Sequence, residues 1–237
     1  MADNNTRPTR RIVIAIDGPA GSGKSTLAAL LARRFHYTNI ETGAMYRALA
    51  GKAMQQGISL DDSSALSTLA ITSQIELVPR TEGNRVMLDG HDVTEQLRTP
   101  EVTEAASRVS VHPPVREWMV QRQREIGAAG GIVMEGRDIG TRVFPDAEVK
   151  IFLDADPEVR GSRRFQQNPA EAEKQAAVVA ELRARDERDR TRANSPLVAA
   201  ADAVHIDSTH LSLDQVMAQA VAIVEERLSA LHREIGS

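Results

Sequence analysis

The sequence of 237 residues contains no cysteine and no long apolar run. Without cysteine the chain makes neither disulfides nor thiolate zinc sites, which is compatible with a reducing compartment. No apolar stretch approaches the roughly 18 residues that span a bilayer. Residues 1–11 carry three arginines ahead of only five consecutive apolar residues, too few for the core of a signal peptide. We therefore expect a soluble, cytoplasmic protein with no membrane partner.

A surplus of basic residues is also absent. The 29 lysines and arginines are outnumbered by 33 aspartates and glutamates, and the formal net charge is −4. A general nucleic-acid binder normally carries excess positive charge to neutralise phosphates, so we expect no nucleic-acid partner and disfavour a nucleic-acid-stimulated ATPase. The six histidines show no spacing typical of metal ligands. The length and a hydrophobic content of 41% fit one α/β domain with additions, which we expect to be a monomer.

The clearest feature that is present is a phosphate-binding loop. Residues 18–25 have the spacing Gly-x4-Gly-Lys-Ser, between a β-branched run at 11–16 typical of a buried parallel strand and a helical pattern at 26–35. The glycines let backbone N–H groups turn around an anion at the positive end of the following helix. Lys24 is expected to reach the β- and γ-phosphates of a nucleoside triphosphate, and Ser25 to ligate Mg²⁺. The predicted donor-binding residues are Gly18, Pro19, Ala20, Gly21, Ser22, Gly23, Lys24, Ser25 and Thr26.

Beyond this loop the chain alternates predicted strands and helices, with one interruption. Thr42 is interpreted as the N-cap of a helix that runs to about residue 56. Further helices are expected at 61–72, 100–111, 114–129, from 157, at about 170–192 and at 212–233, and strands at 132–134, 149–154 and 203–207. Between residues 73 and 97, short strand-like runs separated by Glu-Gly-Asn and Asp-Gly predict an antiparallel insertion. Such an insertion is either a flap that covers a substrate or a surface addition with no role in binding.

These patterns divide the chain into a core and three smaller parts. We expect a core of residues 11–72 and 98–237, and a substrate-side insertion at 73–97. A helical segment at about 158–170, which we name the lid, carries arginines and ends in a predicted mobile loop at 166–170. Residues 1–10 are expected to form a flexible tail.

Charged side chains follow two of the predicted strands, where ligands bind in open parallel sheets. The strand at 132–134 leads into Glu-Gly-Arg-Asp, and this places Arg137 and Asp138 in a ligand site or in a turn held by a surface ion pair. Three arginines on the helix after residue 157 suit either an anion-facing lid or a solvated helix face. These are Arg160, Arg163 and Arg164.

A later charged helix presents two faces. Helical spacing places Arg185, Arg188, Asp189 and Arg192 on one face, and Arg183, Asp186, Glu187 and Arg190 on the opposite one. The first face suits the charged end of a nucleotide, although a solvated helix with weak i,i+4 ion pairs has the same pattern.

Several separated motifs together resemble one family. They are residues 16–25, Thr-Gly-Ala-Met-Tyr-Arg at 42–47, Gly-Arg-Asp-Ile-Gly-Thr at 136–141, Phe-Pro-Asp-Ala at 144–147, Lys-Ile-Phe-Leu-Asp-Ala at 150–155 and Arg-Asp-Glu-Arg-Asp-Arg at 185–190. In order and spacing the chain resembles the bacterial cytidylate kinases, a family of nucleoside monophosphate kinases, from about residue 11 to about residue 230. The resemblance implies a P-loop NTPase three-layer α/β fold with a central parallel sheet, a helical lid and a small antiparallel β insertion. It also implies that Mg²⁺ and ATP support phosphorylation of CMP, and of dCMP, to the diphosphate.

The same resemblance assigns roles by position. Lys24 and the loop amides would bind the donor phosphates, with Ser25 on Mg²⁺, while Arg160, Arg163 and Arg164 would close over the transferring group. Arg47 and Arg137 would hold the acceptor phosphate, although position alone favours a surface arginine at 47. Thr42 also belongs to the implied substrate site. The cytosine would be read by Ser107, Arg116 and Asp138, and the sugar and phosphate side by Arg185, Asp189 and Arg192.

Three positions depart from the family pattern. Glu41 and Glu135 stand where aspartate is expected, and Arg142 stands where an apolar residue is expected. All three lie beside the motifs, so they affect local detail more than the implied activity.

A phosphate loop also occurs in proteins with other functions, and the sequence supports these alternatives unequally. A GTPase switch needs Asn-Lys-x-Asp and Asp-x-x-Gly, and neither occurs in the chain. Kinases with other small acceptors, such as uridylate, adenylate or shikimate, are the nearest alternatives. For any phosphate-monoester acceptor with a second pKa near about 6, the nucleophile is already ionised at neutral pH. No general base is therefore required, and we expect the insertion and the lid to exclude water by closing.

Overall fold

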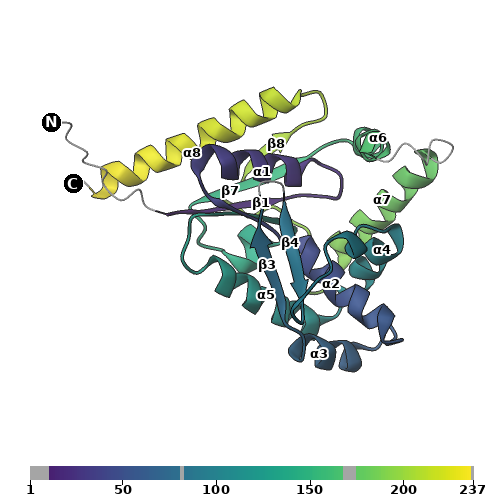
Figure 1. Ribbon diagram of the computed structural model, residues 1–237. Helices are drawn as coiled ribbons and strands as arrows, with labels where there is room; N and C mark the ends of the chain where they lie inside the picture. Colours follow the sequence, from purple (N-terminus) through teal and green to yellow (C-terminus); the bar gives the residue numbers. More distant parts are fainter. Residues whose placement is uncertain (1–10, 81–82, 168–174, 236–237) are drawn as a thin grey trace.

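A parallel sheet of five strands forms the centre of the protein in the computed structural model, which describes residues 11–80, 83–167 and 175–235. Its order is β2-β6-β1-β7-β8, with β1 in the middle. Of these strands, β8, β7 and β1 are labelled in Figure 1. The strands are Thr38–Glu41 (β2), Ile132–Gly136 (β6), Val13–Asp17 (β1), Val149–Asp154 (β7) and Val204–Asp207 (β8). Because β1 pairs in parallel with both β6 and β7, the loop that follows it leaves the sheet at the centre of its carboxyl edge.

Helices cover both faces of this sheet because successive side chains of each strand point to opposite sides. Ile14 and Ile16 of β1 pack with helices Lys24–Phe35 (α1) and Leu213–Ile235 (α8). Ala15 packs toward helix Pro113–Gly127 (α5) on the other face. The layers are visible in Figure 1, where α8 and α1 lie above the sheet and α5 lies below it. The expected three-layer α/β fold is confirmed.

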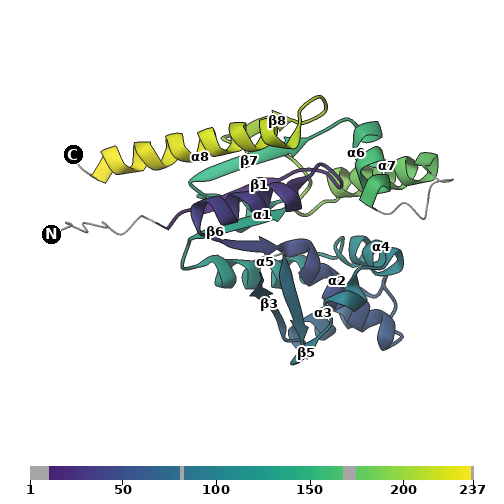
Figure 2. The same cartoon turned by 45° about the horizontal axis from the view of Figure 1, so that its top comes forward.

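A second hydrophobic core surrounds the small antiparallel sheet. Its strands are Ile75–Pro79 (β3), Asn84–Leu88 (β4) and His91–Asp92 (β5), close to the predicted runs, followed by the short 3-10 turn Glu95–Leu97. Strands β3 and β4 share a core of buried side chains with Thr42–Gln55 (α2), Ser63–Ile71 (α3), Pro100–Val109 (α4) and the start of α5. The small sheet is thus part of a body that lies below the central sheet in Figure 2.

One buried side chain joins this body to the edge of the central sheet. The amide of Asn84 accepts a hydrogen bond from the backbone N–H of Glu41 at 3.0 Å and donates to the carbonyl of Asn39 at 2.8 Å. These backbone groups belong to β2, an edge strand with one free side. Asn84 therefore satisfies polar groups that a further strand would otherwise pair.

The remaining helices form a pair at the end of the molecule where α4 also lies (Figure 2). Helix α6 spans Pro157–Gln167 and α7 spans Gln175–Thr191. The predicted mobile loop at 166–170 is therefore wrong for its first two residues, which continue α6, and its last three lie outside the described residues. Within the described ranges, no helix combines the length and apolar character needed to cross a membrane.

Two predicted helix starts need correction by one or two residues. Helix α2 begins at Thr42 itself, with Glu41 at the N-cap, because the Thr42 hydroxyl donates to the carbonyl of Glu135 at 2.8 Å and caps no amide. Helix α3 begins at Ser63 rather than at Asp61. Asp62 is its N-cap, and its carboxylate accepts from the backbone N–H of Ala65 at 2.9 Å.

Candidate active site

The loop between β1 and α1 has the backbone shape that an anion cradle needs. Gly18 adopts a φ of 149°, and a Cβ there would lie 2.0 Å from the carbonyl oxygen of Leu153. Gly23 adopts a φ of 99° immediately before the first residue of α1. Only glycine enters such conformations readily, so both positions explain why the motif requires this residue.

Lys24 and Ser25 project from the first turn of α1. The Lys24 ammonium donates to the carbonyl of Pro19 at 2.5 Å and to the hydroxyl of Ser22 at 3.3 Å. Burial, together with the nearby Arg137, lowers the pKa of Lys24 to about 7. The Ser25 hydroxyl donates to Glu135 Oε1 at 2.8 Å. Burial raises the pKa of Glu135, so a cation at this position would stabilise the carboxylate.

A cavity of about 730 Å³ extends from this loop toward α4 and α7. Its size falls in the range of ligand pockets. It is lined by most of the residues predicted to bind ligands: Ala20, Gly21, Ser22, Gly23, Lys24, Ser25, Thr26, Thr42, Arg47, Ser107, Arg116, Arg137, Asp138, Arg163, Arg164, Arg185, Asp189 and Arg192. Gly18, Pro19 and Arg160 do not line it. The structure thus brings together side chains from both cores and from the α6–α7 pair.

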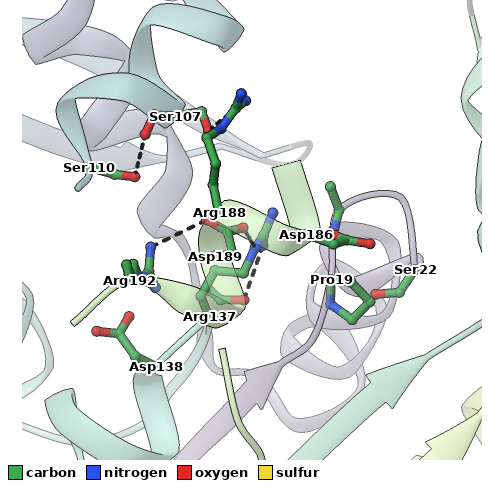
Figure 3. A network of polar contacts seen from close by, with 12 residues as sticks. Pro19, Ser22, Ser107, Ser110, Arg137, Asp138, Asp186, Arg188, Asp189 and Arg192 are labelled. Atoms are coloured by element: carbon green, nitrogen blue, oxygen red, sulfur yellow. Dashed lines mark hydrogen bonds and ion pairs between the residues drawn. The ribbon is translucent and has the colours of Figure 1, made fainter. Parts of the chain in front are cut away.

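Buried ion pairs organise the far end of the cavity. Arg116 donates to Asp138 Oδ2 at 2.5 Å, and both side chains are at most 7% exposed. Asp189 accepts from Arg137 Nε at 2.9 Å and from Arg192 at 3.3 Å (Figure 3). Burial alone would raise the pKa of Asp189, but Arg137 and Arg192 hold it below its ordinary value. Both carboxylates therefore hold arginines in place, and the lowered pKa of Asp189 favours its charged form.

Several guanidinium N–H groups at this end have no partner among the described residues. They are Nε of Arg116, Arg185 and Arg188, and Nη2 of Arg192, all buried. Burial, with Arg137 nearby, lowers the pKa of Arg185 to about 10. Buried donors without acceptors cost free energy, so their convergence indicates a site built for an anionic or polar ligand.

The three arginines predicted for the lid differ in placement. Arg163 lines the cavity and donates to the carbonyl and hydroxyl of Ser208 at 2.7 and 2.9 Å. Arg164 lines it too, with Glu181 3.7 Å away. Arg160 lies outside and is 2% exposed. It donates to the carbonyl of Ala20 at 2.8 Å and pairs with Asp186 at 2.6 Å, so it braces the phosphate loop from behind.

Asp186 was assigned by helical spacing to the face of α7 opposite the nucleotide-facing residues. The structure shows that this second face is not solvated throughout, because Asp186 is buried against Arg160. The spacing placed Asp186 on a different side from Asp189 but did not reveal that α6 covers that side.

The three departures from the family pattern have local explanations. Glu41 pairs with Arg47 at 2.5 Å inside the cavity, and Glu135 accepts from Ser25. Arg142 is exposed, so its charge stays in water. It lies in the π-helical turn Ile139–Val143, which follows Asp138.

Sequence reasoning missed several residues of the cavity wall. Tyr46, whose ring lies 5.6 Å from the guanidinium carbon of Arg116, was treated only as part of a motif. An apolar group near the phosphate loop was also missed. It consists of Leu153, Leu211, Leu213 and Val216, beside Ser208. Most of this group follows β8, so the rule that ligands bind beyond strand ends was the signal available for it.

Asp17, at the end of β1, holds the turn that carries Asp138. Its carboxylate accepts from the backbone N–H groups of Ile139 at 2.8 Å and Gly140 at 2.7 Å. Burial raises the pKa of Asp17 to about 6, against an ordinary value of 3.8. The folded protein therefore binds this proton more tightly than the unfolded chain does.

This shift predicts a pH-dependent contribution to stability. The contribution of Asp17 is fully present below about pH 4 and is lost as the pH rises through about 6. Relative to Asp17→Asn, the free energy of unfolding of the wild type should fall by about 1.5 kcal/mol between about pH 5 and about pH 8. Urea unfolding of both proteins across this range measures the difference. Parallel pH curves would show that Asp17 titrates as in the unfolded chain.

Comparison with known proteins points to one family. The family model described as cytidylate kinase matches residues 14–226. A cytidylate kinase of Solibacter usitatus is 49% identical over 233 residues, covering 97% of each chain. A cytidylate kinase of Geobacillus thermodenitrificans is 49% identical over 224 residues, covering 92% of this chain and 99% of the relative. A crystal structure of an uncharacterised protein from Eubacterium ventriosum has a TM-score of 0.50 at 12% identity, covers 91% of this chain and 99% of its own, and supports the fold alone.

Proposed function

Because the chain belongs to the cytidylate kinase family and is therefore a nucleoside monophosphate kinase, we propose that it transfers the γ-phosphoryl group of ATP to CMP and dCMP. One observation carries this proposal. A single cavity connects the phosphate loop with the buried Arg116–Asp138 pair, so a donor and an acceptor nucleotide fit end to end.

The donor end is formed by the phosphate loop and α1. The loop amides and Lys24 bind the donor phosphates, and Ser25 and Glu135 provide the hydroxyl and carboxylate oxygens that Mg²⁺ accepts as ligands. Bound Mg²⁺ neutralises charge on the β- and γ-phosphates. Arg163 and Arg164, in the same cavity, supply further positive charge, whereas Arg160 positions the loop through Ala20.

The acceptor phosphate is expected between α2 and β6. Arg47 and Arg137 line this part of the cavity, and Thr42 and Gly43 place the N-terminal N–H groups of α2 there. An oxygen of the acceptor phosphate forms a bond to the γ-phosphorus while the bond to the β,γ-bridging oxygen breaks, and ADP leaves. The acceptor oxygen is already ionised, so catalysis rests on alignment and on neutralising the charge of a loose transition state.

The acceptor base and sugar occupy the far end. Cytosine offers an amine donor at N4 beside the acceptors N3 and O2. Asp138 suits the amine, while Arg116 and Ser107 suit the acceptors. Arg185, Asp189 and Arg192 lie where the sugar and phosphate pass, and the unpartnered N–H groups of Arg185 and Arg192 are available to them.

A coupled assay of ADP formation against a panel of acceptors tests this function. The expected order is CMP and dCMP first, UMP well behind and AMP negligible, because uracil presents O4 to the Asp138 carboxylate. A preference for UMP, AMP or a non-nucleotide such as shikimate would overturn the proposed acceptor while leaving the donor site untouched.

We expect two segments to close over the site when both substrates bind: the insertion at 73–97 and the lid. Hydrogen exchange in β3, β4 and α6 should slow when CMP and a non-hydrolysable ATP analogue bind together with Mg²⁺. Exchange in the last turns of α8, far from the cavity residues, serves as the control. Equal exchange with and without both ligands would contradict closure.

A further inference from the structure

Arg188 does not line the cavity, but its side chain contacts Ser107, one of the residues proposed to read the acceptor base. The side chain leaves α7 and extends to α4, where its Nη2 atom donates to Ser107 Oγ at 3.3 Å (Figure 3). The same atom donates to Glu104 Oε2 at 2.9 Å. Glu104 and Ser107 lie three residues apart on one face of α4. Nη2 carries two hydrogens, so it serves both acceptors at once.

The direction of the Arg188–Ser107 hydrogen bond is fixed by chemistry. A guanidinium has donors and no acceptor, whereas a serine hydroxyl has one proton and two lone pairs. Arg188 therefore occupies a lone pair of Ser107 Oγ and leaves the proton free. Ser107 is 3% exposed, and among the described residues its hydroxyl donates to none. This proton is therefore free to be donated to a ligand in the cavity that Ser107 lines.

We propose that Arg188 determines base specificity by keeping the Ser107 hydroxyl in its donor role, which favours cytosine over uracil. The proposal rests on the proposed function, in which Ser107 contacts the acceptor base. Ring position N3 is an acceptor in cytosine and carries a hydrogen in uracil. With uracil the hydroxyl would have to accept from N3, and its own buried proton would lose its partner. The positive charge of Arg188 also strengthens the hydroxyl as a donor and weakens it as an acceptor.

The test is a double-mutant cycle on the ratio of kcat/KM for CMP to that for UMP. Arg188→Met should lower this ratio about tenfold, the size expected for one hydrogen bond. The same substitution in a Ser107→Ala background should leave the ratio unchanged, because the hydroxyl through which Arg188 acts is gone. A ratio that is unaffected by Arg188→Met, or that falls equally in both backgrounds, overturns the proposal.

Two control variants separate this role from simple bracing of α7 against α4. Glu104→Gln weakens the ion pair but leaves Arg188 able to reach Ser107, so the ratio should change less than twofold. Arg183→Met removes another α7 arginine, paired with Glu158 on an exposed surface, and should not change the ratio. A tenfold loss of discrimination in Glu104→Gln would assign the effect to bracing. Arg188→Gln, whose side-chain amide can accept as well as donate and carries no charge, gives the same readout if the methionine variant folds poorly.

The wild-type acceptor panel distinguishes failure of this inference from failure of the proposed function. If the wild type does not prefer CMP to UMP, the proposed acceptor is wrong and the inference falls with it. If it prefers CMP and Arg188→Met keeps that preference, only the role of Arg188 is wrong.

Discussion

Replacing Lys24 by alanine is expected to lower kcat by at least about a hundredfold with little loss of folded structure. Lys24 lies at the start of α1 and faces the cavity where the transferred group would pass. Removing one donor that stabilises transition-state charge typically costs two to three orders of magnitude in rate. The loss should appear in kcat as well as in kcat/KM, which marks an interaction made in the transition state.

The stability of this variant is argued from the contacts of the ammonium. Lys24 is 4% exposed, and it hydrogen-bonds to neutral oxygen atoms of Pro19 and Ser22. Its lowered pKa shows that burial disfavours the charge, so alanine removes an unfavourable desolvation along with two hydrogen bonds. Steady-state kinetics with CMP and thermal unfolding measure both quantities. Near wild-type turnover in a folded Lys24→Ala protein would contradict the assigned role of the loop.

The sequence predicted the parts of the molecule whose physical cause is local. The phosphate loop is one example, because Gly18 and Gly23 are required by backbone geometry within a few residues of the lysine they position. Strands β1, β6, β7 and β8 of the central sheet are another, since a short β-branched run beside a helical pattern has few alternatives in an α/β protein.

Features that depend on distant contacts could not be predicted in the same way. Arg160 carries the same charge as Arg163 and follows the same strand, but only the folded chain shows that Asp186 and Ala20 hold it outside the cavity. The insertion at 73–97 was recognised by its turns, whereas the core that it shares with α2 to α5 required the packed structure. Arg188 belongs here too, because spacing placed it on the right face of α7 without revealing its reach to α4.

The second large effect is expected for Asp138→Asn, which should greatly reduce the preference for cytosine over uracil. The Asp138 carboxylate would accept from the N4 amine of cytosine, whereas the O4 atom of uracil would place a second acceptor against it, with no hydrogen between the two. Asparagine keeps the shape and one acceptor, and adds an NH2 donor that suits O4. Asp138→Asn should therefore lower the ratio of kcat/KM for CMP to that for UMP by about 30- to 1000-fold, or roughly 2–4 kcal/mol.

Asparagine is a better test here than alanine because Asp138 also neutralises Arg116 at 2.5 Å. Alanine would leave that buried guanidinium uncompensated, which typically costs about 3–5 kcal/mol in stability and would obscure the kinetics. Asp186→Asn is the matched control, since it weakens another buried Arg–Asp pair that does not line the cavity. It should change kcat/KM for both acceptors by the same factor. If Asp138→Asn also lowers both equally, Asp138 positions the turn or the phosphate end, and other residues distinguish cytosine from uracil.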